Sequence, residues 1–530
     1  MDLIAIAVAC IGFLFFAYRR LLRYLHMLQQ DDYNNKRFIK WMFSSGSIDK
    51  YLSAILIVIA VGAFFLRDSV DHSWISVGIG VLFLGWSFIE SDPRTAAKKK
   101  LVLTKRAKRI LYAGLGVCLL VAVVVGSVFG VYGWAIAVQL IPFALCDGNL
   151  LLRPFEKKIQ NRFRGEAVEK LNSVSPKVVS VTGSFGKTSV KHIVGHVLTL
   201  NAKALMTPGS VNTEMGVSRI IREQLNPGTQ FFVTEMGAYG IGSIERLCKF
   251  TPPDVGIITA IGAAHLERFG SLENTAKAKF ELAESVLAEP DGLMILHESV
   301  MKYGNNFDFV TSNRDRVTVV GDSSESDLVI TRRQQTADGL EIDITWQGEP
   351  YSLFSVLYGS HHGDNMALAF ATAAVVGIDP KKIVASLKSA PQIKHRLEVK
   401  KQPDGTVYID DAFNSNPKGF EAAMRLMKKI TPDTSRSILV TPGIVELGHD
   451  HDSVHKNLGK LAAEMADVVV AVNPVRVPTF VEALNNAGIE LVEFDSFAEA
   501  DVWLRSNVVP GDVVLIENDL PDLFNEPLNI

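Results

Sequence analysis

The sequence predicts an N-terminal bundle of α-helical membrane spans followed by two α/β domains. Nearly all of the excess hydrophobicity lies before residue 150. At Lys177–Ser189 a β-branched segment runs into a glycine turn and then a helical pattern, and beyond it strands alternate with helices almost to the C-terminus. We expect a membrane domain over residues 1–150, a connector over 151–175, a central α/β domain over 176–394 and a C-terminal α/β domain over 395–530.

The composition excludes several classes of protein. A chain of 530 residues is too long for a single core. The net charge of −3, from 54 basic and 57 acidic residues, gives no sign of a nucleic-acid partner. The cysteines lack the paired spacing of a zinc site, so we expect α/β domains without disulfides or zinc; they are Cys10, Cys118, Cys146 and Cys248.

Five apolar segments are predicted to span a membrane: Leu3–Tyr18, Tyr51–Leu66, Trp74–Ile89, Ile110–Val125 and Val128–Leu145. Their lengths of about 16 to 18 residues are at the short end for a hydrocarbon layer of roughly 30 Å. Any one of them could be a buried helix of a soluble protein, but five in a row with basic linkers favour a membrane domain. The last two form one long apolar run that is broken only by Gly126, Ser127, Gly130 and Gly133.

Basic residues predict the orientation of these spans. Lysines and arginines follow the first span, separate the third from the fourth, and follow the fifth. The connections Arg67–Ser73 and Gly126–Ser127 are nearly free of them. Because basic loops remain on the cytoplasmic side, we expect the N-terminus outside and everything beyond residue 150 in the cytoplasm.

The segment KVVSVTGSFGKTS, Lys177–Ser189, is a candidate phosphate-binding loop. Glycines allow backbone N–H groups to turn inward, and the start of a helix carries partial positive charge. Lys187 would reach the outer phosphates, and the Thr188 hydroxyl would bind Mg²⁺. The full Walker pattern of phosphate-binding loops requires a glycine where this chain has Val181. A simple tight turn is therefore the alternative interpretation. The preceding strand and the following helix favour nucleotide binding.

The rest of the sequence predicts alternating strands and helices. Strands are expected at Phe231–Glu235, Asp254–Thr259 and Leu293–His297, with helices at Gly242–Lys249 and Leu272–Leu287. This alternation predicts a mostly parallel sheet, with an antiparallel excursion at Val317–Tyr358. A helix pair, Asn365–Val376 and Pro380–Ser389, precedes the last domain. That domain has expected strands at Gly405–Asp410, Ser437–Thr441, Val468–Val472, Glu490–Glu493 and Asp512–Ile516.

Two side chains follow strands that lie next to the phosphate loop in the predicted sheet. Glu235 ends one strand, and His265 follows the next. Ligands of open α/β sheets bind at the carboxyl ends of the strands, and a carboxylate there can hold Mg²⁺. An ordinary loop acid and a hydrogen-bonded histidine are the alternatives. The convergence of both strands on one phosphate loop favours the metal site.

Several motifs resemble those of the Mur ligase superfamily, most closely its D-alanyl-D-alanine-adding branch. The resemblance covers about residues 176–530 and keeps the family order. The motifs are TGSFGKTS, TPGSVNTEMGV, EMGAYG with the following PPDVGIITAIGAAHLERFGS, GSHHGDNMALA, HRLE, DDAFNSNP, and GIVELG with HKNLG. The resemblance implies a central P-loop ATPase domain and a C-terminal Rossmann-like domain.

The resemblance also implies roles for individual residues. The ATP cradle would consist of Thr182, Gly183, Ser184, Phe185, Gly186, Lys187, Thr188 and Ser189. Thr188 and Glu235 would hold one Mg²⁺. His265 would hold a second with a lysine carbamylated by CO₂, for which the spacing favours Lys279 over Lys277. Carbamylation requires a neutral amine; the alternative is that both lysines are solvated positions on a helix.

Further positions match the motifs of the Mur ligase superfamily, with two departures from the usual residues. Asn365 fits the asparagine that contacts adenine, Arg396 fits the arginine that reaches ATP from the last domain, and Asp411 and Asn414 lie in the loop that closes over the nucleotide. His361 fits its motif, but His362 stands where an asparagine is usual. Asn212 and Thr213 match a substrate-side loop that usually reads Asn-Asn.

The implied chemistry is ATP-dependent ligation of a carboxylate to an amine through an acyl phosphate. The expected partners are a carboxylate-bearing cell-envelope precursor, an amino acid or dipeptide, and the lipid bilayer, with other envelope-synthesis membrane proteins as further candidates. The family's UDP-gripping domain is replaced here by the apolar spans. We therefore expect a lipid-linked or membrane-proximal acid, with the UDP-linked muramoyl tripeptide as the alternative. We also expect a multi-pass location in the bacterial inner membrane.

A rival interpretation is a membrane transporter or regulator whose Mur-like domain only hydrolyses ATP. The predicted spans hold few interior charges, which argues against an ion path. Amine-dependent release of phosphate would distinguish a ligase from this alternative.

Overall fold

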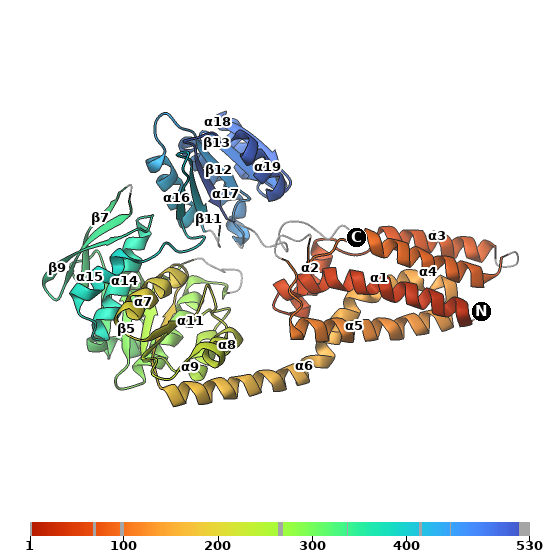
Figure 1. Cartoon of the computed structure of the whole chain (residues 1–530), viewed down its shortest axis with the longest axis horizontal. Coiled ribbons are helices and arrows are strands. Elements are labelled where there is room, and N and C mark those ends of the chain that lie inside the picture. The colour runs from red at the N-terminus through yellow and green to blue at the C-terminus, as the bar shows by residue number, and fades with distance from the viewer. Residues whose placement is uncertain are drawn as a thin grey trace. The chain divides into compact units, whose positions relative to one another are not determined.

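The computed structural model describes residues 3–66, 70–95, 100–262, 269–336, 338–412, 416–445 and 447–518. The chain divides into a helical unit that ends at Asn161 and an α/β unit that begins at Arg162 (Figure 1). Helix α6 begins in the first unit and ends in the second.

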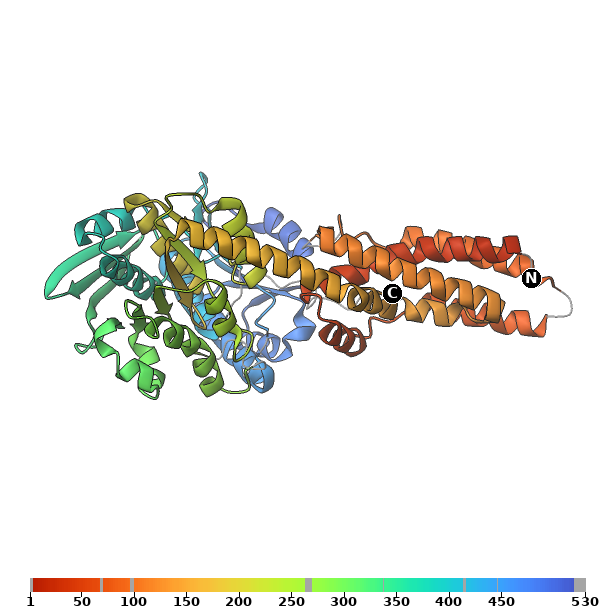
Figure 2. The ribbon, with the colours of Figure 1, turned by 90° about the horizontal axis from the view of Figure 1, so that it is seen from below.

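Helices, most of them apolar, make up the first unit. They are α1 (Leu3–Gln30), α2 (Asn35–Ser44), α3 (Tyr51–Phe65), α4 (His72–Ile89), α5 (Lys105–Val124) and α6 (Trp134–Val174), with the short turns η1 (Val125–Phe129) and η2 (Gly130–Tyr132) between the last two. Four segments are long and apolar enough to cross a membrane, and α3 is apolar but shorter. The long helices of this unit run side by side (Figure 2).

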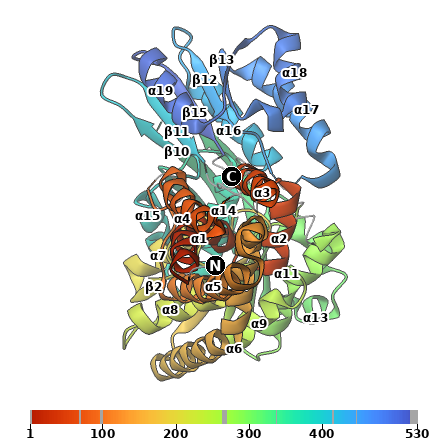
Figure 3. The same cartoon turned by 90° about the vertical axis from the view of Figure 1, so that its right-hand side faces the viewer.

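Glycines allow these helices to approach closely. A Cβ on Gly12 of α1 would collide with the backbone of Gly80 of α4, and one on Gly148 of α6 would lie 2.6 Å from the Gly114 nitrogen of α5. Small residues at helix contacts are typical of membrane bundles, where packing rather than the hydrophobic effect drives association. Figure 3 looks along this group of helices.

A buried ionic network lies just outside the predicted spans, which themselves hold few interior charges as expected. Arg20 is 1% exposed and contacts Asp49 at 2.9 Å and Glu90 at 2.6 Å, and Arg23 contacts Glu90 at 2.6 Å. The predicted spans ended at Tyr18 and Ile89, whereas α1 continues for three further turns to Gln30. The network therefore lies beyond the apolar stretches, at one end of the helices.

Two predicted boundaries also differ from the structure. The long apolar run divides at η1 and η2, close to the glycines that suggested it. The fifth span and the expected connector form the single helix α6, which contains Pro142 and Pro154. A helix tolerates a proline when other groups satisfy the freed backbone carbonyl, so proline alone did not mark its end.

The central sheet has nine strands in the order β2-β3-β1-β4-β5-β6-β7-β8-β9. The first six in this order are parallel neighbours, β7 also runs parallel to β6, and β7, β8 and β9 pair antiparallel. The antiparallel excursion expected from Val317 therefore begins later, because β6 extends the parallel part of the sheet. The strands are β1 (Lys177–Thr182), β2 (Ala204–Met206), β3 (Phe231–Glu235), β4 (Val255–Ile258), β5 (Leu293–His297), β6 (Val317–Gly321), β7 (Leu328–Gln335), β8 (Leu340–Trp346) and β9 (Glu349–Ser355).

Helices cover this sheet and create two hydrophobic cores. One core joins α7 and α14 to the sheet, and the other joins α9 and α11. The helices and turns are α7 (Lys187–Asn201), α8 (Glu214–Gln224), α9 (Ser243–Phe250), α11 (Leu272–Leu287), α12 (Glu298–Gly304), α13 (Asp308–Thr311), η3 (Arg314–Arg316), α14 (His361–Val375) and α15 (Pro380–Lys388). Sequence reasoning missed β2, α8, α12 and α13.

The last domain has a six-stranded sheet in the order β10-β11-β15-β12-β13-β14, parallel except for β10. Its strands are β10 (Glu398–Lys401), β11 (Val407–Asp411), β12 (Ser437–Thr441), β13 (Val468–Val472), β14 (Glu490–Phe494) and β15 (Val513–Glu517). Its helices and turns are α16 (Pro417–Ile430), η4 (Gly448–Asp450), α17 (His451–Met465), η5 (Pro474–Arg476), α18 (Pro478–Ala487) and α19 (Phe497–Asn507).

The end of α6 is part of the central domain. Ala167 and Leu171 pack in one core with Ile220 and Ile221 of α8. The Ser218 hydroxyl donates to the Phe163 carbonyl at 3.0 Å, and Arg222 lies over the Phe163 ring at 3.9 Å. This packing buries the apolar face of the last turns of α6.

Candidate functional site

The phosphate loop connects β1 to α7, and its glycines have conformations that other residues adopt poorly. Gly183 has φ +147° and Gly186 has φ +78°. A Cβ on Gly183 would collide with the Thr259 hydroxyl. The Lys187 ammonium donates to the Gly183 carbonyl at 2.7 Å and to the Ser184 carbonyl at 3.3 Å. The loop therefore curls around its own lysine, as a phosphate cradle requires.

The neighbouring strand ends hold this loop in place. The Ser184 N–H donates to the Ala260 carbonyl at 2.7 Å, and its hydroxyl accepts from the Gly262 N–H at 3.0 Å. The Thr259 hydroxyl donates to the Phe185 carbonyl, and the Thr182 hydroxyl donates to the Met236 carbonyl at 2.9 Å. The start of the cradle is thus fixed to the residues after β3 and β4.

Glu235 lies at the centre of a group of polar side chains at the end of β3. It is 1% exposed. One carboxylate oxygen accepts from the Thr188 hydroxyl at 2.9 Å, and the other accepts from the Asn212 amide at 3.0 Å. Lys191 lies 3.8 Å from the first oxygen. A hydroxyl oxygen beside a carboxylate is the type of ligand set that Mg²⁺ takes, so Thr188 and Glu235 fit this ion.

Burial distinguishes the two candidate lysines on α11. Lys279 is 4% exposed, whereas Lys277 is exposed. Burial and then the charge of Lys187 lower the pKa of Lys279 well below its usual value, while Glu235 and Glu281 oppose this change. Such an environment favours the neutral amine that CO₂ requires. The proposed metal partner His265 lies outside the described residues, as does Asn414.

Asn365 lies beside the phosphate loop. A Cβ on Gly186 would lie 2.9 Å from its amide oxygen. The Asn365 amide donates to Nδ1 of His362 at 3.2 Å. Burial lowers the pKa of His362 well below its usual value, so this ring is neutral and its proton is on Nε2. The unusual histidine of this motif therefore orients Asn365.

Charged groups of the last domain act on the phosphate loop. The Lys187 pKa is lowered by burial and by Arg396 and raised by Glu235. Asp411 accepts a hydrogen bond from the Leu397 N–H at 3.1 Å, and burial raises its pKa to about 6 although Arg396 opposes the change. Glu517, which is fully buried, pairs with Asp411 in the β11–β15 register. Burial lowers the pKa of Arg396, and the negative charges of Asp411, Glu235 and Glu517 oppose this change.

Comparisons with known proteins identify both α/β domains. Residues 181–373 match the Mur ligase middle domain, and residues 395–517 match the Mur ligase, glutamate ligase domain; together these ranges exceed half of the chain. The chain belongs to the Mur ligase family. As a Mur ligase, the protein is an ATP-dependent ligase that forms peptide-type bonds.

Similar proteins include ligases named for adding D-alanyl-D-alanine. The UDP-N-acetylmuramoyl-tripeptide–D-alanyl-D-alanine ligase of Mycobacterium tuberculosis is 28% identical over 383 residues, which cover 64% of this chain and 70% of that protein. The enzyme of the same name from Escherichia coli is 28% identical over 289 residues, covering 54% of this chain and 62% of that protein.

Solved structures share the fold. MurF from Acinetobacter baumannii has a TM-score of 0.58 and 23% identity over 68% of this chain and 77% of that chain. MurF ligase from Thermotoga maritima, solved in complex with ADP, has a TM-score of 0.56 and 24% identity over 68% of this chain and 80% of that chain.

Sequence reasoning missed three buried residues near the site of this Mur ligase: Lys191, His362 as a partner of Asn365, and Glu517. The sequence could have indicated Lys191, because it follows Lys187 by four positions and therefore lies on the same face of the predicted helix. Burial lowers its pKa to about 8, and Glu235 opposes this change. Glu517 and the His362 contact had no local signal, because their partners come from distant segments.

Proposed function

We propose that this Mur ligase joins the amine of D-alanyl-D-alanine, or of a similar dipeptide, to the carboxylate of a muramoyl-tripeptide precursor. The observation that carries the proposal is the contact of one carboxylate, Glu235, with both the Thr188 hydroxyl of the phosphate loop and the Asn212 amide of the neighbouring loop. This contact joins the site for the outer phosphates to the candidate acid site. The names of the relatives support the choice of substrates.

The reaction proceeds in two balanced steps. A carboxylate oxygen of the acid attacks the γ-phosphorus, the bond to the β–γ bridging oxygen breaks, and ADP leaves. The amine nitrogen then attacks the acyl carbon, the bond to the phosphate oxygen breaks, and inorganic phosphate leaves as the nitrogen loses its proton. Bound Mg²⁺ supplies charge neutralisation for phosphoryl transfer. Lys187 binds the outer phosphates, Glu235 and Thr188 hold the ion, and Asn365 positions the adenine.

Lys279 is the residue we propose for carbamylation. A lysine that adds CO₂ exchanges a cationic amine for an anionic oxygen ligand, which suits a second metal site. Its burial beside Lys187 and the exposure of Lys277 support this choice between the two. Arg396 of the last domain, near Lys187, would neutralise phosphate charge when the nucleotide is bound, and closure of that domain would exclude water from the acyl phosphate.

The decisive experiment measures amine-dependent ligation. Purified full-length protein receives Mg²⁺, ATP and D-alanyl-D-alanine with UDP-linked muramoyl tripeptide, and product is identified by mass spectrometry. We expect phosphate release to require both the acid and the amine. A Lys187→Ala variant should lose at least about a hundredfold in kcat, because a preorganised charge on the transferred phosphoryl group is lost. ATP hydrolysis that ignores the amine would contradict ligation.

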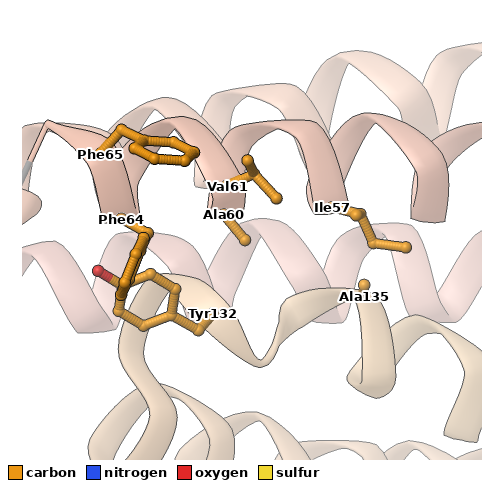
Figure 4. Close-up of a pocket in the computed structure, with 7 residues that line it drawn as sticks. All are labelled: Ile57, Ala60, Val61, Phe64, Phe65, Tyr132 and Ala135. Atoms are coloured by element: carbon orange, nitrogen blue, oxygen red, sulfur yellow. The ribbon is translucent and has the colours of Figure 1, made fainter.

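We also propose that the helical unit is embedded in the bacterial inner membrane with the catalytic domains in the cytoplasm. Four apolar helical segments, the glycine contacts and the basic linkers support this location. A hollow of about 500 Å³ in this unit, drawn in Figure 4, is lined only by apolar and aromatic residues, as expected of a surface that faces lipid chains. Its lining residues are Ile57, Ala60, Val61, Phe64, Phe65, Tyr132 and Ala135.

This location motivates a second candidate acid, a lipid-linked form of the same precursor. The relatives' names favour the UDP-linked form over the lipid-linked form that the sequence analysis put first. The ligation assay separates them when both acids are offered to protein in vesicles at equal concentration. Faster turnover of the UDP-linked acid supports the relatives' substrate, and faster turnover of the lipid-linked acid supports the membrane-carried one.

A further inference from the structure

The most unusual charge near the phosphate loop is the ammonium of Lys191. Its side chain is fully buried on α7. Burying an ammonium is costly unless hydrogen bonds and an opposite charge compensate for the lost hydration. Both are present, because the Lys191 ammonium donates to the Gly209 carbonyl and lies 3.8 Å from a carboxylate oxygen of Glu235.

The position of Lys191 on α7 places it on the metal-side face of the helix. Thr188 and Lys191 are three residues apart, so their side chains share one face. Both approach the same oxygen of Glu235, the hydroxyl at 2.9 Å and the ammonium at 3.8 Å. Lys191 therefore belongs to the same polar cluster as the residues that we propose for Mg²⁺.

The other partner of Lys191 belongs to the loop over residues 207–213, which we call the acid loop. Gly209 and its neighbours at the tip of this loop are exposed. Asn212, further along the acid loop, donates to the second oxygen of Glu235 at 3.0 Å, and its carbonyl accepts from the Gly237 N–H at 3.2 Å. The acid loop is thus tied to Glu235 at two points, directly through Asn212 and through Lys191 at Gly209.

We propose that Lys191 is a positioning residue that holds the acid loop against Glu235 and so aligns the acid substrate with the phosphate loop. This inference rests on the proposed function for the identity of the acid. The Gly209 backbone also forms a hydrogen bond with His192, a ring that burial keeps neutral by lowering its pKa to about 4. A charged donor makes a stronger hydrogen bond to a carbonyl than a neutral one, so Lys191 is the stronger tie. Without the ammonium, the Gly209 end of the loop keeps the weaker contact with His192 and is held less firmly, while the phosphate loop keeps its own contacts.

The test replaces Lys191 with methionine, which keeps the unbranched chain up to its fourth heavy atom and removes the ammonium group and its charge. We expect amide hydrogen exchange over residues 207–213 to become at least about tenfold faster in the ligand-free full-length protein. We expect KM for the acid to rise about tenfold, with the affinity for Mg²⁺ and a non-hydrolysable ATP analogue changed less than about threefold. A purely structural role would instead weaken both ligands together with thermal stability.

Lys203→Met is the matched control. The Lys203 ammonium also donates to a backbone carbonyl, that of Pro227 at 2.6 Å, but Lys203 is exposed and makes no hydrogen bond or ion pair with the site residues that the structure describes. We expect normal acid-loop exchange and a normal KM for the acid in this variant. An effect equal to that of Lys191→Met would overturn the proposal.

A second variant keeps the test informative if Lys191→Met does not fold. Asn212→Ala removes the other tie and leaves Lys191 in place, so we expect exchange at the Gly209 end of the acid loop to stay within about threefold of the wild-type rate, and a tenfold increase there would refute the role of Lys191. Unchanged exchange at that end in folded Lys191→Met, or faster exchange with an unchanged KM for the acid, refutes the role of Lys191. Because hydrogen exchange needs no substrate, a wrong choice of acid would leave this readout intact and fail only the ligation assay.

Discussion

At the scale of single residues, His455 shows how backbone contacts fix a charge state. Its Nε2 accepts from the Ile444 N–H at 3.0 Å, and its Nδ1 lies 2.8 Å from the His451 carbonyl, to which it donates. Only the neutral ring can accept and donate in this way. Burial lowers the pKa of His455 to about 4, and the neighbouring His451 ring adds to the change.

A pH-dependent loss of stability follows from this histidine. Between about pH 6.5 and pH 4 the unfolded state binds a proton at this position that the folded state does not. Stability is therefore present above about pH 6.5 and falls as the pH is lowered through this window, by roughly 1–3 kcal/mol. His455→Gln can accept and donate in the same way without titrating. Thermal melts at a series of pH values should show a shallower acid-side fall for the variant, and equal slopes would contradict the assignment.

At the scale of elements, Glu281 links two helices beside the phosphate loop. It lies on α11 two residues after Lys279, and its carboxylate accepts from the N–H groups of Gly242, Ile244 and Glu245 at the start of α9. An anion at a helix N-terminus accepts from N–H groups that have no partner within the helix. It also interacts favourably with the positive end of the helix dipole. Glu281 therefore fixes α9 on α11, close to the proposed carbamylation site.

Neutralising this carboxylate should loosen α9. We expect Glu281→Gln to lower the free energy of unfolding by about 1–2 kcal/mol, because a charged acceptor of three N–H groups becomes a neutral one. Glu284→Gln, an exposed position on the same helix, is the control and should stay near wild type. Chemical denaturation of the full chain in detergent measures both, and an equal change in the two variants would argue against the cap.

At the scale of the whole molecule, two different kinds of packing operate in one chain. The α/β unit has hydrophobic cores on both sides of its mostly parallel central sheet, where burial of apolar surface drives folding. The helical unit presents large apolar side chains on its surface, including Trp74 at 75% and Phe88 at 81% exposure. Exposed apolar surface of this extent suits a lipid environment, in which close backbone contacts stabilise helix pairs.

The glycine contacts of the helical unit make this difference testable. A side chain on Gly80 would lie 2.7 Å from the Val8 carbonyl, so Gly80→Leu should push α1 and α4 apart. Gly78 on the same helix has open space around it, and Gly78→Leu should be tolerated. Thermal unfolding in detergent is expected to show a loss of about 2–4 kcal/mol for Gly80→Leu. A stable Gly80→Leu variant would show that the two helices do not need this contact.

The sequence could predict the features that depend on local patterns. Helix α11 and the strands β3, β5, β12 and β13 match their expected bounds, because apolar periodicity and turn residues are readable along the chain. The proximity of Thr188 and Glu235 was also predictable, since neighbouring parallel strands end at the same edge of a sheet. The motifs identified the family from residues 176–530, and the family matches confirm it.

Only the tertiary structure decided which of these groups are buried and what they contact. Lys279 and Lys277 are two positions apart and look alike in the sequence, but one faces the core and the other faces solvent. Lys191, Glu517 and the Arg20 network acquire their roles from partners that lie far away along the chain. Side chains become buried only when distant segments pack together. In the low dielectric of that interior, the pKa of a buried group shifts and its hydrogen bonds and ion pairs strengthen.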